Sequence, residues 1–189
     1  LDPLHRYRRY ITEDRLPSFV DDEIAVFGFN STLSLTTKHG RLRESDIAFA
    51  CARLTQLPSQ IVRIVVLHHP FDLPPNNSER DLLRHATSAM QALAGCRVDL
   101  ILSGHLHLSH VSETAQRYRI AGHSAVVVQA GTALSIRQRG ESNSFNVLRL
   151  APNQWEIERR SWNLETQTYS DVEVKALTRN SLPSLENFS

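Results

Sequence analysis

Four histidines of this sequence follow apolar segments, in two well separated pairs. His68 and His69 come directly after the first segment, and His105 and His107 follow the second one through a Ser-Gly dipeptide. A neutral imidazole is a good ligand for zinc, iron, manganese or copper. Side chains placed just past strand ends can point into one cleft from rigid supports. We therefore predict a metal site among these strand-end histidines.

The spacing of these residues leaves the type of site open. His105 and His107 would lie on the same side of an extended segment, but a turn at Gly104 would let each reach a different metal ion. Three histidines alone would make a zinc site with one open position, whereas a pair of metal ions needs bridging carboxylate or water oxygens as well. A single strand-end histidine is more often structural, so the prediction rests on the joint pattern.

The apolar segments themselves predict an α/β fold. Ile24–Phe29, Ile61–Leu67 and Val98–Leu102 have the composition of strands, and the last two lack the alternation expected of a solvent-facing strand. Apolar residues recur at helical spacing over Arg43–Leu57, with Ser45 as its expected cap, and from Ser78 to Gly95. In such folds ligands gather at the carboxyl ends of the strands, where both histidine pairs fall.

After His107 the pattern changes to short strands without intervening helices. We expect antiparallel pairing among these strands, in which His110 faces solvent; they are Val111–Arg119, Ala125–Ala130, Phe145–Leu150 and Trp155–Trp162. Ser, Asn and Pro dominate from Thr178 onward. We therefore expect residues 1–177 to belong to one domain and residues 178–189 to form a disordered tail.

Two of these segments resemble the histidine signatures of the calcineurin-like metallophosphoesterases. Val65–Pro70 is similar to the His-His-Pro signature, and Leu102–His107 is similar to the Gly-His-x-His signature. Ile24–Thr32 and Val126–Thr132 resemble two further strands of that family. The resemblance covers the sequence from about Tyr10 to Trp162 and is closest to bacterial phosphodiesterases of cyclic nucleotides and glycerophosphodiesters.

The resemblance implies a fold, a site and an activity. The fold would be part of a four-layer αββα sandwich, with a mixed sheet, helices on one side and C-terminal antiparallel strands. His68 and His105 would bind one metal ion and His107 the other. His69 is a separate candidate, either as a catalytic residue that lines the phosphate pocket or as a structural residue at the strand end. Two ions drawn from iron, manganese, zinc or cobalt would activate water for the hydrolysis of a small phosphoester substrate.

The sequence also departs from the family. The family has three further motifs that supply carboxylates to the metal ions, and none of them occurs in this sequence: Asp-x-His, Gly-Asp-x-x-Asp and Gly-Asn-His-Asp/Glu. We therefore expect the chain to be the C-terminal portion of one domain. Its partner would be the missing N-terminal portion of the same domain, and without that portion we expect the chain to self-associate. The alternative is a non-catalytic regulatory or binding module on a degenerate form of the fold.

The composition of the sequence argues against nucleic-acid binding and against a membrane-spanning helix. The 189 residues are 41% hydrophobic and 22% charged, as in ordinary soluble domains, and the formal charge of +1 provides no basic surplus for nucleic acid. No apolar run approaches the roughly 20 residues that a membrane helix needs. Cys51 and Cys96 lack metal-type spacing, so we expect reduced core thiols and a cytoplasmic location.

Overall fold

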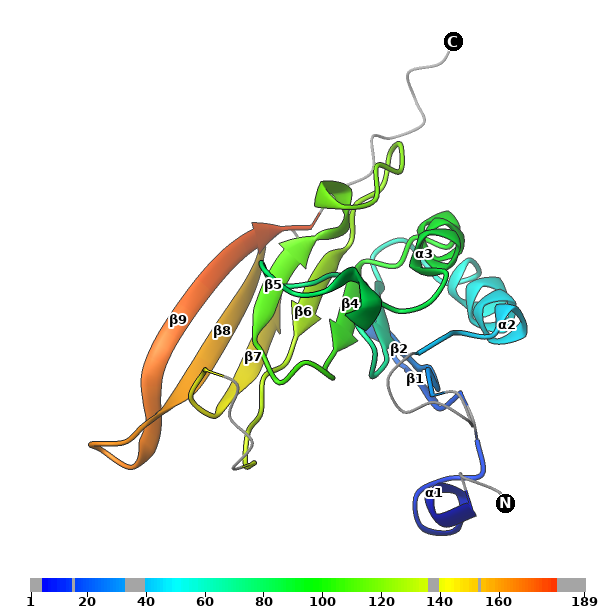
Figure 1. Ribbon diagram of the computed structural model, residues 1–189. Helices are drawn as coiled ribbons and strands as arrows, with labels where there is room; N and C mark the ends of the chain where they lie inside the picture. Colours follow the sequence, from blue (N-terminus) through cyan, green and yellow to red (C-terminus); the bar gives the residue numbers. More distant parts are fainter. Residues whose placement is uncertain (1–4, 15, 33–39, 136–139, 153, 180–189) are drawn as a thin grey trace.

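The computed structural model describes residues 5–14, 16–32, 40–135, 140–152 and 154–179 (Figure 1). Three layers are visible in it, a small sheet, a larger sheet and a pair of helices. The helices and strands are, in chain order, α1 (His5–Tyr10), β1 (Ser18–Val20), β2 (Ile24–Gly28), α2 (Glu44–Leu54), β3 (Val62–Val66), the 3₁₀ helix η1 (Glu79–Asp81), α3 (Ala86–Gly95), β4 (Leu100–Ser103), β5 (His110–Glu113), the 3₁₀ helix η2 (Thr114–Gln116), β6 (Val126–Gln129), β7 (Ser144–Leu150), β8 (Gln154–Asn163) and β9 (Thr168–Thr178).

The larger sheet has six strands in the order β1-β2-β3-β4-β6-β5. Strands β2, β3, β4 and β6 run parallel, and β1 and β5 close the two edges in antiparallel pairing. The register pairs Ile64 of β3 with Leu100 of β4. Because the two strands are adjacent and parallel, the loops that follow them both start at the carboxyl ends of the strands, on the same side of the sheet.

Helices α2 and α3 cover one face of this sheet (Figure 1). Their apolar residues recur on one side of each helix and are buried, with Leu54, Met90 and Leu93 fully enclosed. Cys51 of α2 and Cys96, just after α3, are joined by a disulfide. The expectation of two reduced thiols is therefore wrong, because the packing of the two helices brings together cysteines that sequence spacing alone does not relate.

The three strands β7, β8 and β9 form an antiparallel sheet on the opposite face. Trp155 and Ile157 of β8 pack against Ile64, Leu100 and Val126 of the larger sheet. The predicted fold class is confirmed: a mixed sheet has helices on one side and C-terminal antiparallel strands on the other. None of the described helices has both the length and the apolar composition needed to cross a membrane.

Some elements differ from the sequence-based expectation. The helix predicted from Ser78 is divided into η1 and α3, because His85 adopts a left-handed backbone conformation before α3. Strand β6 pairs in parallel with β4 as well as antiparallel with β5, so only part of the expected antiparallel pairing occurs. Ser45 lies inside α2, whose N-cap is Arg43.

The C-terminal end of the described chain is anchored. Strand β9 runs through Thr178, and the guanidinium of Arg179 bonds both carboxylate oxygens of Asp99 at 3.1 Å. The remainder of the predicted tail, residues 180–189, lies outside the described residues.

Candidate metal centre

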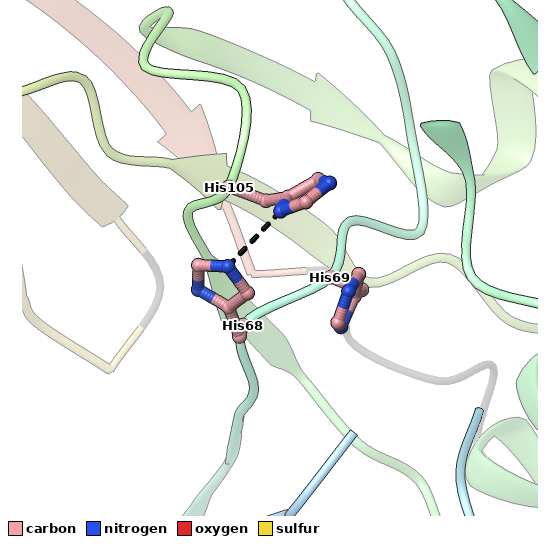
Figure 2. A group of neighbouring side chains, drawn as sticks. All are labelled: His68, His69 and His105. Atoms are coloured by element: carbon pink, nitrogen blue, oxygen red, sulfur yellow. Dashed lines mark hydrogen bonds between the residues drawn. The ribbon is translucent and has the colours of Figure 1, made fainter. Parts of the chain in front are cut away.

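Three imidazoles lie together at the carboxyl ends of β3 and β4 (Figure 2). One ring nitrogen each of His68, His69 and His105 lies within 4.8 Å of the other two, and His105 Nδ1 is 3.0 Å from His68 Nε2. Two nitrogens that bind one zinc ion at about 2.0–2.1 Å in tetrahedral geometry are about 3.3 Å apart. The spacing of His68 and His105 therefore fits two ligands of a single metal ion with little movement.

The loops that carry these histidines are tied to each other at the edge of the sheet. Gly104 donates its backbone N–H to the carbonyl of His68 at 3.2 Å, which continues the pairing of β3 and β4 into the loops. His105 and His107 have φ values of 77° and 60°. Such left-handed conformations are strained for residues other than glycine and tend to occur where function requires them. The strained turn aims the His105 ring at His68.

His69 is buried and its ring is fixed from two sides. Ser31 Oγ lies 2.9 Å from His69 Nδ1 and 3.3 Å from the backbone nitrogen of His69. A Cβ atom on Gly40 would lie only 2.2 Å from Cγ of His69, so the ring occupies the space that a side chain would take. With the proton on Nδ1, that nitrogen donates a hydrogen bond to Ser31 Oγ, and Nε2 keeps a lone pair.

His107 does not belong to this group. Its Nδ1 lies 2.7 Å from Thr132 Oγ1, in the loop after β6. Burial lowers the pKa of His68, and the positive charge that His107 can carry lowers it further. This shift favours the neutral imidazole that binds metal. The structure thus brings together two of the three predicted ligands, with His69 as the third member of the group.

His110 is half-buried instead of facing solvent as we expected. Its Nε2 lies 3.3 Å from Oδ2 of Asp72, a buried carboxylate three residues after His69. Sequence reasoning missed Asp72, Ser31 and Gly40 as supports of the site. The signal for Asp72 was weak, because an aspartate in a proline-rich loop usually faces solvent.

A cavity of about 280 Å³ opens beside His68. Its wall is mostly apolar, from Tyr7, Pro17 and Phe29, while Asn30 and Arg8 add polar groups. No carboxylate belongs to the histidine group within the described part of the chain. The three imidazoles could therefore hold one metal ion, but these residues do not complete a two-metal site.

Comparison with known proteins shows similarity of fold only. No family model and no curated protein matches the sequence. Among solved structures, GAP50, the anchor in the inner membrane complex of Plasmodium, aligns with 84% of this chain and 52% of its own, at a TM-score of 0.51 and 15% identity. A dimetal phosphatase from Danio rerio aligns with 74% of this chain and 39% of its own, at a TM-score of 0.49 and 17% identity.

The chain therefore shares a fold with GAP50, and it spans about half or less of the length of these two proteins. One is described as a phosphatase and the other as an anchor. The fold alone does not decide between catalysis and binding, so the residues of the site must carry the functional assignment.

Proposed function

We propose that this chain carries the histidine part of a metal centre that hydrolyses a phosphate ester. The observation that supports it most is the convergence of His68, His69 and His105 at the ends of two neighbouring parallel strands. In the complete centre two ions of iron, manganese, zinc or cobalt would be held, with carboxylates added by residues outside this sequence. Such a pair binds the phosphate oxygens and lowers the pKa of a bridging water.

The residues of this chain have separate roles in the proposal. His68 and His105 bind metal as neutral imidazoles, and His69 is the third ligand when a single ion is present. Ser31 Oγ accepts a hydrogen bond from Nδ1–H of His69 and so sets the tautomer and orientation of that ring, as partners of metal-bound histidines commonly do. His107, held by Thr132, is the ligand that would serve a second ion.

The substrate in this proposal is a small phosphoester that extends from the metal centre into the cavity beside His68. Arg8 in the cavity wall adds positive charge for an anionic phosphate, while Tyr7 and Phe29 provide apolar surface for the alcohol portion. A cavity of about 280 Å³ suits a small molecule.

An uncovered apolar strip supports the proposal that further strands complete the sandwich. The cross-strand register places Phe19, Val26 and Ile64 on one face of the larger sheet. The smaller sheet covers this same face where it is formed by β4 and β6. On the same face Phe19 is 56% exposed and Val66 is 36% exposed. Exposed apolar surface of this kind favours association. We expect the 189-residue chain to self-associate, and a compact monomer in light scattering would contradict this part of the proposal.

The second candidate is a non-catalytic binding module. Two observations favour it: the histidine group contains no carboxylate in the described part of the chain, and the GAP50 protein of similar fold is described as an anchor. In that case the fold would present a surface to a partner, and the histidines would have no hydrolytic role.

Hydrolysis of bis(4-nitrophenyl) phosphate with Mn²⁺, Zn²⁺ or Fe²⁺ tests the proposal. We expect little activity from this chain, since one ion lacks the clamp on attacking and leaving oxygens, and metal-dependent activity from a longer version that supplies the carboxylates. His105→Ala should abolish that activity. An inactive longer version that still binds metal would favour the binding module, and full activity from this chain alone would show that the ligand set is wrong.

A further inference from the structure

The loop after His69 is held by a buried carboxylate. Asp72 is only 6% exposed, and it accepts hydrogen bonds from Ser112 Oγ at 2.5 Å and Arg117 Nε at 2.7 Å. His110 Nε2, 3.3 Å from Oδ2, is the third donor. Burial alone would raise the pKa of Asp72, but these three donors outweigh it and hold the pKa well below its usual range. The carboxylate is therefore ionised and fully engaged at neutral pH.

These contacts join the two loops that carry the metal-binding histidines. Asp72 lies three residues after His69, and its partner His110 lies three residues after His107. The hydrogen bond between Asp72 and His110 therefore closes a connection from the first histidine loop to the second. Ser112 of β5 donates a second hydrogen bond to Asp72, so the first histidine loop is also attached to this strand.

Other contacts make the first loop rigid, so that a change at Asp72 is transmitted to the histidines. Tyr118 Oη donates to the carbonyl of Phe71, whose ring is completely buried. Leu83 donates its backbone N–H to the carbonyl of Pro70 at 3.0 Å. With residues 70, 71 and 72 each fixed, His68 and His69 have little independent freedom.

We propose that Asp72 is a positioning residue of the metal centre, which sets the separation of the His68–His69 loop from the His105–His107 loop. The inference rests on the proposed metal site, and it goes beyond it by assigning a role to a residue that touches neither metal nor substrate. Groups behind the ligands of metal sites typically change affinity by 10–100-fold when they are removed.

The test compares Asp72→Asn with Asp99→Asn. Asp99 is a suitable control because it too is a largely buried acid paired with an arginine, Arg179, but it precedes β4 instead of following β3. We expect Asp72→Asn to weaken Co²⁺ binding by 10–100-fold and to change the visible spectrum of bound Co²⁺. Asp99→Asn should lower the stability to urea while leaving affinity and spectrum unchanged. Equal Co²⁺ affinity in all three proteins, or equal losses in both variants, would overturn the proposal.

Two further measurements cover the cases in which the main test gives no answer. If Asp72→Asn does not fold, Ser112→Ala removes one donor and should weaken Co²⁺ binding by about threefold, whereas Arg117→Lys, which keeps the charge, should retain most of the affinity. If the wild-type protein binds no Co²⁺, the proposed function fails. The positioning role is then tested by NMR of the imidazoles of His68 and His105, whose signals Asp72→Asn should shift and Asp99→Asn should not. Unchanged signals in both variants would refute it.

Discussion

Polar side chains lie at both the amino ends and the carboxyl ends of the strands in the larger sheet, but their hydrogen-bond and ion-pair partners differ. At the amino ends of β3 and β4, Arg63 is buried and donates to the carbonyls of Leu54 and Leu57, while Asp99 receives the Arg63 backbone N–H and the Arg179 guanidinium. At the carboxyl ends, His68 and His105 face each other across 3.0 Å with no carboxylate in their group among the described residues.

The difference fits a structural cluster at the amino end and the proposed metal centre at the carboxyl end. Each charge at the amino end has partners of opposite charge or well-placed carbonyls, so this end needs no ligand to account for it. The carboxyl end holds strained backbone at His105 and three imidazoles whose ring nitrogens lie within 4.8 Å of one another, an arrangement that suits a cation. Changes at the two ends should therefore affect different properties.

The largest expected effect is the loss of metal binding at the carboxyl end. His105→Ala removes one of three ligands and should weaken Zn²⁺ binding by more than about 100-fold, because ligands contribute more than the groups behind them. His123→Ala is the matched control: His123 is half-buried, its pKa is lowered by burial, and it lies near Asp99 at the other end. Titration calorimetry with Zn²⁺ should show this contrast, and equal losses in the two variants would remove the distinction between the ends.

Stability should depend on the amino end. Arg179→Ala leaves the largely buried Asp99 without its ion-pair partner and should cost about 2–3 kcal/mol of unfolding free energy. Urea unfolding followed by circular dichroism measures this cost. Zn²⁺ affinity should stay within twofold of wild type, and a much larger loss of affinity would mean that the two ends are coupled.

Acid should destabilise the protein in part through Asp72. Because the pKa of Asp72 is held low in the folded protein, its contribution is present above its unfolded pKa of about 4 and is lost as the pH falls below that value. Asp72→Asn should therefore remove about 2 kcal/mol of stability at pH 7 and flatten the decline below pH 4. Urea unfolding between pH 7 and pH 2 measures both. An unchanged acid profile in the variant would show that other carboxylates dominate.

A smaller effect is expected from Gly40. Gly40→Ala would place a methyl group 2.2 Å from Cγ of His69, so the ring must move away from its position beside His68. We expect about tenfold weaker Zn²⁺ binding, comparable to the loss of a group behind a ligand. Gly95→Ala is the control, because a Cβ there has no neighbour within 4 Å. Wild-type affinity in Gly40→Ala would mean that His69 is not a ligand of the bound ion.

The sequence predicted the meeting of His68 and His105, because apolar runs identify buried parallel strands and residues after such strands share one edge. It did not predict that His69, not His107, joins them, since the direction of a side chain just past a strand depends on the turn that follows. Asp72 was missed because its partners lie about 40 residues away in the chain.

Strand β9 was missed for another reason. Most of its residues are exposed, and charged side chains alternate with Val172 and Val174, so it lacks the apolar run of a buried strand. The disulfide between Cys51 and Cys96 likewise depends on how α2 and α3 pack. In each case the missing information is tertiary, which local pattern does not contain.

The most direct test of the metal centre is X-ray absorption at the zinc edge with one equivalent of Zn²⁺ bound. Three imidazole nitrogens at about 2.0–2.1 Å are predicted for the wild-type protein, and two for His69→Ala. A first coordination shell with fewer than two imidazoles, or one that His69→Ala and His105→Ala both leave unchanged, would contradict a metal site on His68, His69 and His105.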